Sequence, residues 1–187
     1  GDHRTLHSFP TRRSSDLVPG HPIHTFMAEN DAARASLKRL KAASFALALP
    51  WKRSGKTEAA FDEAVRDFRK ILIHYTRKEN QLFPHLEAAG FDAPSKVMWG
   101  KHDEIRALFK AIDDARKAGD GSAARRAAGS LAAKASRMFF MEERILFPTA
   151  LRKLSERDWI VLRRGEAAIG YAWITPGGAW EDRKSVV

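Results

Sequence analysis

Apolar residues recur at helical spacing through most of the chain. From Pro19 to about residue 170 they lie three or four residues apart, in long stretches separated by short segments that contain Gly or Pro. This spacing aligns apolar side chains on one face of a helix, and Gly or Pro marks the ends of such helices. The pattern predicts four long helices and a short fifth helix capped by Ser155. The long helices are expected over residues 22–49, 57–89, 94–118 and 122–154.

The connections between these helices are short, and no hairpin signal is present. Long amphipathic helices joined by short connections are typical of an antiparallel four-helix bundle. We therefore predict an all-α fold, a four-helix bundle with a short fifth C-terminal helix and an extended tail. Residues 18–168 would form the bundle and the short helix. The Gly-, Pro- and Trp-containing segment 169–181 would be an extended linker toward a C-terminal domain that the chain lacks.

A repeat links the second and fourth predicted helices. His74 to Pro84 aligns without gaps with Met138 to Pro148, and both segments end in Leu-Phe-Pro. Each proline removes a helical hydrogen bond and should kink its helix. The repeat predicts two helix pairs related by a pseudo-twofold axis, with any shared site between them.

The repeat places Lys78 opposite Glu142 and Glu79 opposite Glu143. With 100° per residue, Glu79 and Glu143 fall inside the apolar stripes of their helices, whereas Lys78 and Glu142 fall at the edges. A carboxylate in an apolar stripe is costly unless it is paired or bound to a cation. One such glutamate is best explained by an Arg or His partner. Two in equivalent places favour a metal.

Histidines on the other helices strengthen this interpretation. His21 and His24 project from one side of the first helix, and His74 and His102 lie in the second and third. His85 returns to the face of His74 but lies about 16 Å along the axis, too far to share a metal. Imidazole and carboxylate groups from facing helices build dinuclear iron or manganese sites in helical bundles.

These residues resemble those of the hemerythrin-like (HHE cation-binding) domain. The resemblance is strongest to the domain found in DUF438 proteins, which are associated with PAS sensor domains. The similar segments contain His21-Pro-Ile-His24, His74 to Pro84, Lys101-His102-Asp-Glu-Ile, Glu142 to Pro148 and Ile169-Gly-Tyr-Ala-Trp.

The resemblance implies a cytoplasmic signalling domain with a non-haem iron centre, often di-iron, that senses O₂, NO or redox state. It implies metal ligands at His24, His74, Glu79, His102, Glu142 and Glu143, with His21 in reserve. The family pattern is incomplete, because Lys78, Arg106 and Met138 stand where the family has ligands. Such a set could hold one metal, two metals or none. The alternative is a metal-free scaffold or interaction domain.

The amino-acid composition excludes several other classes of protein function. The chain has 187 residues, no Cys and a net charge of +10. Without Cys, zinc fingers, iron–sulfur clusters and cysteine nucleophiles are excluded. The basic residues are spread over every helix without a recognition motif, so nucleic acid and membrane are not expected partners. Di-iron sites can reduce NO or peroxide, but no substrate pocket is indicated, so catalysis is not predicted.

The two ends differ from the rest. Residues 1–17 and 182–187 resemble translated ends of a short-read sequencing adapter, and we expect them to be artefactual and disordered. They contain five basic and three acidic residues, so the remainder still has a net charge of about +8.

Overall fold

The computed structural model describes residues 18–49, 51, 54–178 and 180. The predicted all-α class is confirmed, and the described residues contain no strand. Two of the long helices are each interrupted by a π-helical turn, η3 or η4. The elements are α1 (Pro22–Ala48), α2 (Gly55–Phe68), α3 (Ile71–Arg77), η3 (Lys78–Leu82), α4 (Phe83–Ala88), α5 (Ala93–Lys117), α6 (Gly121–Met141), η4 (Glu142–Leu146), α7 (Phe147–Lys153) and α8 (Glu156–Ile169).

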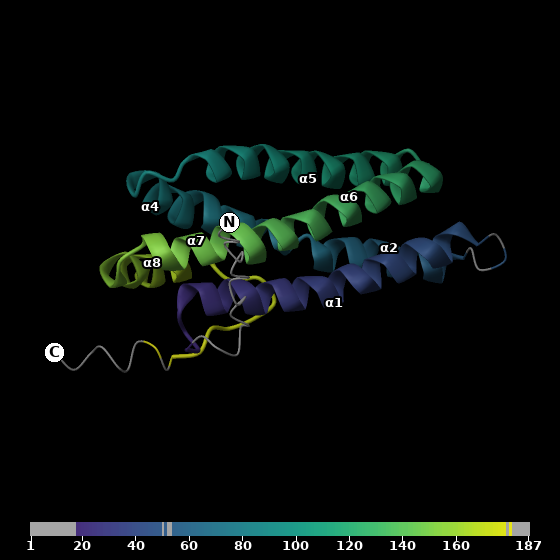
Figure 1. Ribbon diagram of the computed structural model, residues 1–187. Coiled ribbons are helices and arrows are strands. Elements are labelled where there is room, and N and C mark those ends of the chain that lie inside the picture. The colour runs from purple at the N-terminus through teal and green to yellow at the C-terminus, as the bar shows by residue number, and fades with distance from the viewer. Residues whose placement is uncertain (1–17, 50, 52–53, 179, 181–187) are drawn as a thin grey trace, which may run out of the picture.

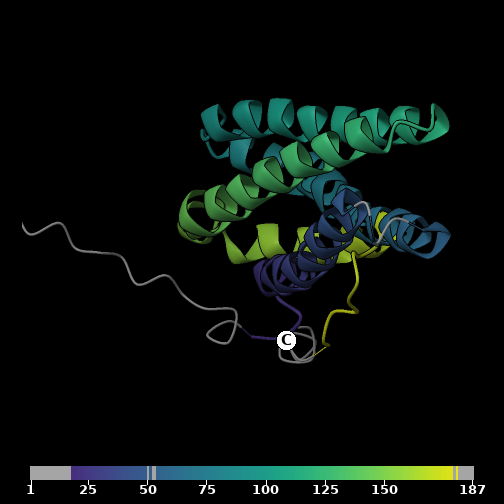
Figure 2. The ribbon, with the colours of Figure 1, turned by 90° about the vertical axis from the view of Figure 1, so that its right-hand side faces the viewer.

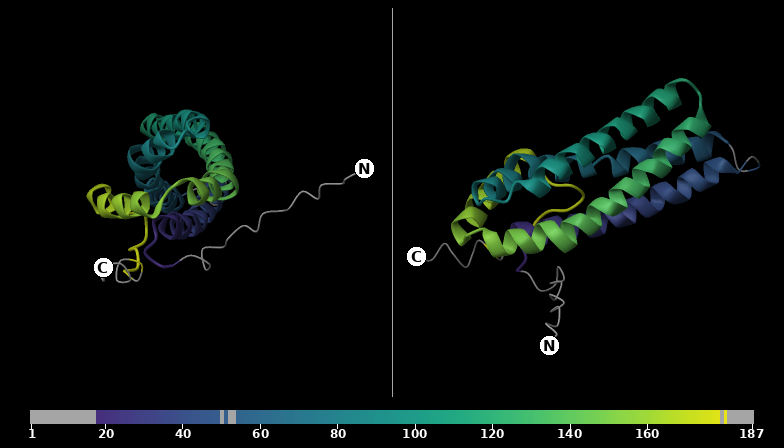
Figure 3. Two further views of the ribbon diagram at one scale, coloured as in Figure 1. Left: turned by 60° about the vertical axis from the view of Figure 1, so that its left-hand side comes forward. Right: turned by 45° about the horizontal axis from the view of Figure 1, so that its top comes forward.

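The long helices pack as two antiparallel pairs around a common axis. Helix α1 packs along α2, α5 packs along α6, and α1 also contacts α6 (Figure 1). The end-on view in Figure 3 shows the long helices arranged in a ring, with α8 beside one end. In Figure 2 the pair α5 and α6 lies above the pair α1 and α2. The structure therefore has the predicted bundle with its short fifth helix.

Local sequence explains where the helices begin. The His21 side chain accepts a hydrogen bond from the Ile23 amide, and Pro22 follows in the first turn, where its missing N–H costs nothing. Ser155 caps α8 through a capping box with Asp158, as the sequence predicted. These caps supply partners for amides that have none within the helix.

The predicted kinks take the form of the two π-helical turns. The Phe83 amide donates to the Lys78 carbonyl, and the Phe147 amide donates to the Glu142 carbonyl, each five residues back. Pro84 and Pro148 follow immediately. A proline has no N–H and its ring crowds the carbonyl four residues earlier, so a wider turn accommodates it. Both repeats thus adopt the same distortion at equivalent positions.

The C-terminal segment returns to the bundle. Ala172 is fully buried, the Trp173 ring packs against Phe68, and the Trp173 indole donates to Asp67 over 3.3 Å. Figure 3 shows this segment running back along the bundle after α8. Within the described residues no helix is long and apolar enough to cross a membrane. Residues 1–17 and 182–187, expected to be artefactual, lie outside the described residues.

Candidate metal centre

The two π-helical turns place Lys78 and Glu142 in the interior of the bundle. Both residues are fully buried and their side chains form an ion pair. The expectation that they lie at the edges of the apolar stripes was wrong. The buried face is wider than the apolar stripe, because it also includes polar side chains such as those of His74 and Arg77. Glu143, expected inside its stripe, keeps a side chain that is 25% exposed.

The Lys78 ammonium lies between an imidazole and a carboxylate. Its Nζ is 3.0 Å from Nε2 of His102 and contacts Oε1 of Glu142. Burial lowers the pKa of Lys78, and the Glu142 carboxylate opposes that effect. Burial would raise the pKa of Glu142, but Lys78 and His74 hold it well below its usual range. The two groups therefore stabilise each other as a charged pair.

His102 links this pair to Glu79. Burial and the neighbouring Lys78 ammonium lower the pKa of His102 to about 3, so its ring is neutral at pH 7. Nε2 accepts from Lys78, and Nδ1 donates to Oε1 of Glu79 over 2.7 Å. The ring also stacks on Tyr75, with centroids 4.1 Å apart. These contacts fix both the tautomer and the orientation of the imidazole.

His74 links Glu142 to a second buried carboxylate. Its Nε2 is 3.1 Å from Oε2 of Glu142, and its Nδ1 is 2.8 Å from Oε2 of Glu29. The other oxygen of Glu29 accepts from Arg77 over 2.6 Å and from the Ala172 amide over 2.7 Å. Burial raises the pKa of Glu29, but His74, Arg77 and the amide together hold it below its usual value.

Arg77 extends the network to α8 and the C-terminal segment. Its guanidinium is fully buried, lies 3.5 Å from Glu166, and stacks over the rings of Phe26 and Tyr171. It also donates to the Gly170 carbonyl over 3.4 Å. The network therefore involves α1, α3, η3, α5, η4, α8 and the segment after α8.

The predicted ligands do not all meet. His74, His102, Glu79 and Glu142 belong to one network, and Asn30 connects Glu143 to it by donating to both Glu142 and Glu143. His24 is partly exposed on α1, and none of the hydrogen bonds or ion pairs of the network involves it. His21 caps α1 and contacts the rings of Trp159 and Trp180. The assignment of metal ligands stays a prediction.

Sequence reasoning missed several members of the network, namely Glu29, Asn30, Arg77 and Glu166. The signal for two of them was present in the first helix. Glu29 and Asn30 lie three and four residues after Phe26, and Ala33 lies four and three residues after them, so all share one helical face. Glu29 and Asn30 therefore share with Glu79 the sequence pattern of a polar residue on an apolar helix face.

The donor atoms fit an ammonium better than a divalent metal. The Nε2 lone pair of His102 and an oxygen of Glu142 are atoms that a metal would use, and both contact Lys78 Nζ. Among the described residues, no group of three or more metal-binding side chains is arranged to hold an ion. Each glutamate of the network also has at least one cationic partner. The glutamates are Glu29, Glu79, Glu142, Glu143 and Glu166, and the cations are Arg34, Arg77, Lys78, Arg106 and Arg163.

Comparison with known proteins identifies the family. A search of curated proteins finds no match. The sequence model of the Hemerythrin HHE cation binding domain matches residues 21–150, which include α1 to η4 and most of α7. This match covers well over half of the 187 residues, so the chain belongs to the hemerythrin HHE cation-binding domain family.

Proposed function

We propose that this domain is a metal-independent member of its family that serves as an interaction module. In this proposal the Lys78 ammonium takes the place of the cation. The observation that supports it most directly is the position of Lys78 Nζ between His102 and Glu142, with the lysine side chain fully buried.

The proposal explains how so many charges are stable in the core. A buried charge is tolerated when it is paired and its hydrogen bonds are satisfied. Lys78, His102 and Glu79 form a continuous chain of hydrogen bonds, and Glu142, His74 and Glu29 form another. A divalent ion added between His102 and Glu142 would have to displace Lys78 and would meet its positive charge.

Metal content of the purified domain and of a Lys78→Glu variant tests the proposal. The substitution restores the His-x-x-x-Glu pattern of the family, from His74 to residue 78, and replaces the built-in cation by a carboxylate. We expect the natural sequence to contain less than about one tenth of an equivalent of metal after reconstitution with Fe²⁺ without oxygen. The variant should bind Fe²⁺ and gain thermal stability from it.

A Lys56→Glu variant is the control, because it makes the same charge change at an exposed site on α2. It should bind no more metal than the natural sequence. Stoichiometric metal in the natural sequence would overturn the proposal.

The second candidate is the iron-binding sensor of O₂, NO or redox state that signals to a PAS-type domain. The convergence of His74, His102, Glu79 and Glu142 in one buried network favours it. About two irons per chain in the natural sequence would support this candidate. Binding of iron should then be lost in His74→Ala and His102→Ala variants.

A further inference from the structure

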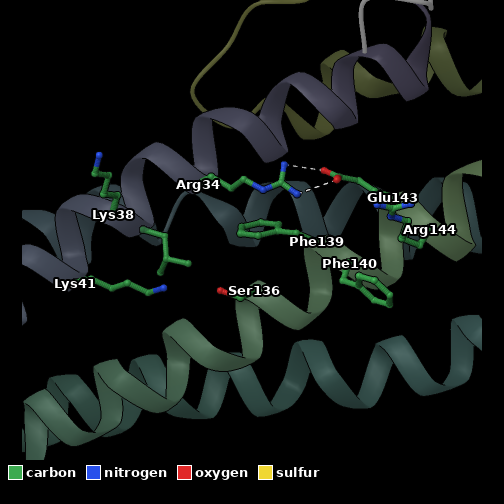
Figure 4. Close-up of a pocket in the computed structure, with 9 residues that line it drawn as sticks. Arg34, Lys38, Lys41, Ser136, Phe139, Phe140, Glu143 and Arg144 are labelled. Carbon is green, nitrogen blue, oxygen red and sulfur yellow. Dashed lines mark hydrogen bonds and ion pairs between the residues drawn. The ribbon is translucent and has the colours of Figure 1, made fainter. Parts of the chain in front are cut away.

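A groove beside the buried network lies between α1 and α6. Its volume is about 470 Å³, and Figure 4 shows the side chains that line it. One wall comes from α1 and the other from α6 and the start of η4. The lining residues are Arg34, Leu37, Lys38, Lys41, Ser136, Phe139, Phe140, Glu143 and Arg144.

The groove has an excess of positive charge. Arg34 forms a bidentate pair with Glu143, with two N–O distances of 2.8 Å, so these two charges cancel. Among the described residues, Lys38, Lys41 and Arg144 pair with no carboxylate. Lys96 and Lys110, by contrast, each pair with an aspartate four residues away in the sequence. Three uncompensated cations therefore line the groove.

The groove also has an aromatic wall. Phe140 is 63% exposed, whereas its neighbour Phe139 is buried under the Arg34 guanidinium, 5.0 Å from the ring centroid. An exposed aromatic ring costs free energy in water, and it gains that energy back when an apolar partner covers it. Leu37 continues the apolar surface toward α1.

We propose that this groove binds an acidic peptide segment bearing an apolar side chain. The apolar side chain would cover Phe140, and carboxylates of the segment would pair with Lys38, Lys41 and Arg144. An amphipathic helix with acidic residues beside its apolar face presents both features at helical spacing. This inference names the class of partner for the interaction module proposed above and rests on that proposal.

The arrangement of the cations favours a ligand with several separated negative charges, such as a helical peptide, over a compact anion. Lys38 and Lys41 lie on α1, whereas Arg144 lies across the groove on η4. In Figure 4, Lys41 extends along the groove toward Ser136, and Lys38 points away from α6. The three charges therefore do not converge on one point, as they would around a single phosphate group.

Fluorescence anisotropy with a labelled helical peptide tests the proposal. The peptide has Glu on one face and Leu and Phe at i, i+4 spacing on the other, and the control peptide has Gln in place of Glu. We expect saturable binding of the acidic peptide that weakens as NaCl is raised, because salt screens exposed charges. Binding of the Gln peptide should be weaker by at least about tenfold.

Variants of the protein locate the site. A Lys38→Glu/Lys41→Glu double variant and a Phe140→Ser variant should each lose at least about tenfold in affinity. A Lys56→Glu variant should bind like the natural sequence, because that lysine is exposed on α2, which does not line the groove. Circular dichroism confirms that each variant is folded.

Three results would overturn the proposal. They are equal affinity in all variants, equal affinity for both peptides, and competition by inorganic phosphate at concentrations where sulfate has no effect. Peptide binding is measured without added metal, and metal content is measured without peptide. The two measurements thereby distinguish a failure of the peptide-binding proposal from a failure of the proposal that the domain needs no metal.

Discussion

The two π-helical turns, η3 and η4, have the same backbone and different chemistry. Each ends with an amide that donates to the first carbonyl of the turn, and each is followed by proline. The second residue of each turn is a glutamate that forms an ion pair with an arginine. Glu79 pairs with Arg106, and Glu143 pairs with Arg34. The pseudo-twofold arrangement predicted from the repeat therefore extends to the side chains.

The first position of each turn breaks the symmetry. It is Lys78 in η3 and Glu142 in η4, and the two side chains form an ion pair. Their neighbours differ too, since His102 contacts Lys78 and Asn30 contacts Glu142. Two carboxylates at these positions would repel each other without a bound cation. One inverted charge lets the same backbone form a self-neutralising pair.

The largest expected effect on the free energy of unfolding comes from removing the positive charge of Lys78. Lys78→Met should lower the free energy of unfolding by about 3–5 kcal/mol, because Glu142 stays buried without its cation. Denaturant unfolding followed by circular dichroism measures the loss. Lys110→Met, at an exposed lysine paired with Asp114, is the matched control and should leave the free energy of unfolding nearly unchanged.

Adding Glu142→Gln to Lys78→Met should recover part of the loss, since the unpaired charge is then gone. This double variant also keeps the comparison measurable if Lys78→Met alone fails to fold. A loss below about 1 kcal/mol in Lys78→Met would contradict the role of the buried pair.

The second comparison concerns the arginine-held glutamates. The Glu79 side chain is 4% exposed and binds both His102 and Arg106, whereas that of Glu143 is 25% exposed. Glu79→Gln should therefore cost about 2 kcal/mol of unfolding free energy, and Glu143→Gln under about 1 kcal/mol. Urea unfolding of both variants under one condition measures the difference. Equal losses would mean that the two halves are energetically alike.

An effect smaller than that of Lys78→Met is expected in the pH dependence of stability. The pKa of His102 is about 3 in the folded protein, below its ordinary value of 6.5. Below pH 6.5 the unfolded chain therefore binds a proton that the folded protein does not. Stability due to this difference is complete above pH 6.5 and is lost as pH falls toward 3, by at most about 1.4 kcal/mol per pH unit.

Unfolding free energies at pH 7, 6 and 5 measure this slope. The Glu79 and Glu142 carboxylates, whose pKa values lie below 4.5, add their own losses only at lower pH. His102→Gln should reduce the slope, while His85→Gln, at a part-exposed histidine beside Asp158, should keep it. An unchanged slope in His102→Gln would show that another group is responsible.

The fold could be predicted from sequence because its determinants are local. Helical spacing, Pro22 in the first turn and the Ser155 capping box each act within a few residues. The repeat supplied the pairing of helices. The π turns were not predicted, since an ordinary helical wheel assumes constant rotation. Lys78 and Glu142 were misplaced for another reason: the buried face includes polar residues, so apolar residues alone do not define it.

The site could be predicted only in part because it depends on contacts between distant residues. His74, His102, Glu79 and Glu142 were identified, and the structure brings them into one network. Their partners Arg77 and Glu166 resemble ordinary surface charges in the sequence. Only packing of α3 against α8 reveals that they are buried.

The bond from the Ala172 amide to Glu29 has a consequence for modularity. The family match ends at residue 150, yet this donor lies 22 residues beyond that boundary and satisfies a carboxylate in the first helix. A fragment cut at the family boundary would lose that donor, together with Glu166 and the Gly170 carbonyl that contact Arg77. The part of the chain that has to be kept together is therefore longer than residues 21–150, because the backbone segment after α8 supplies a hydrogen bond to a buried carboxylate of α1.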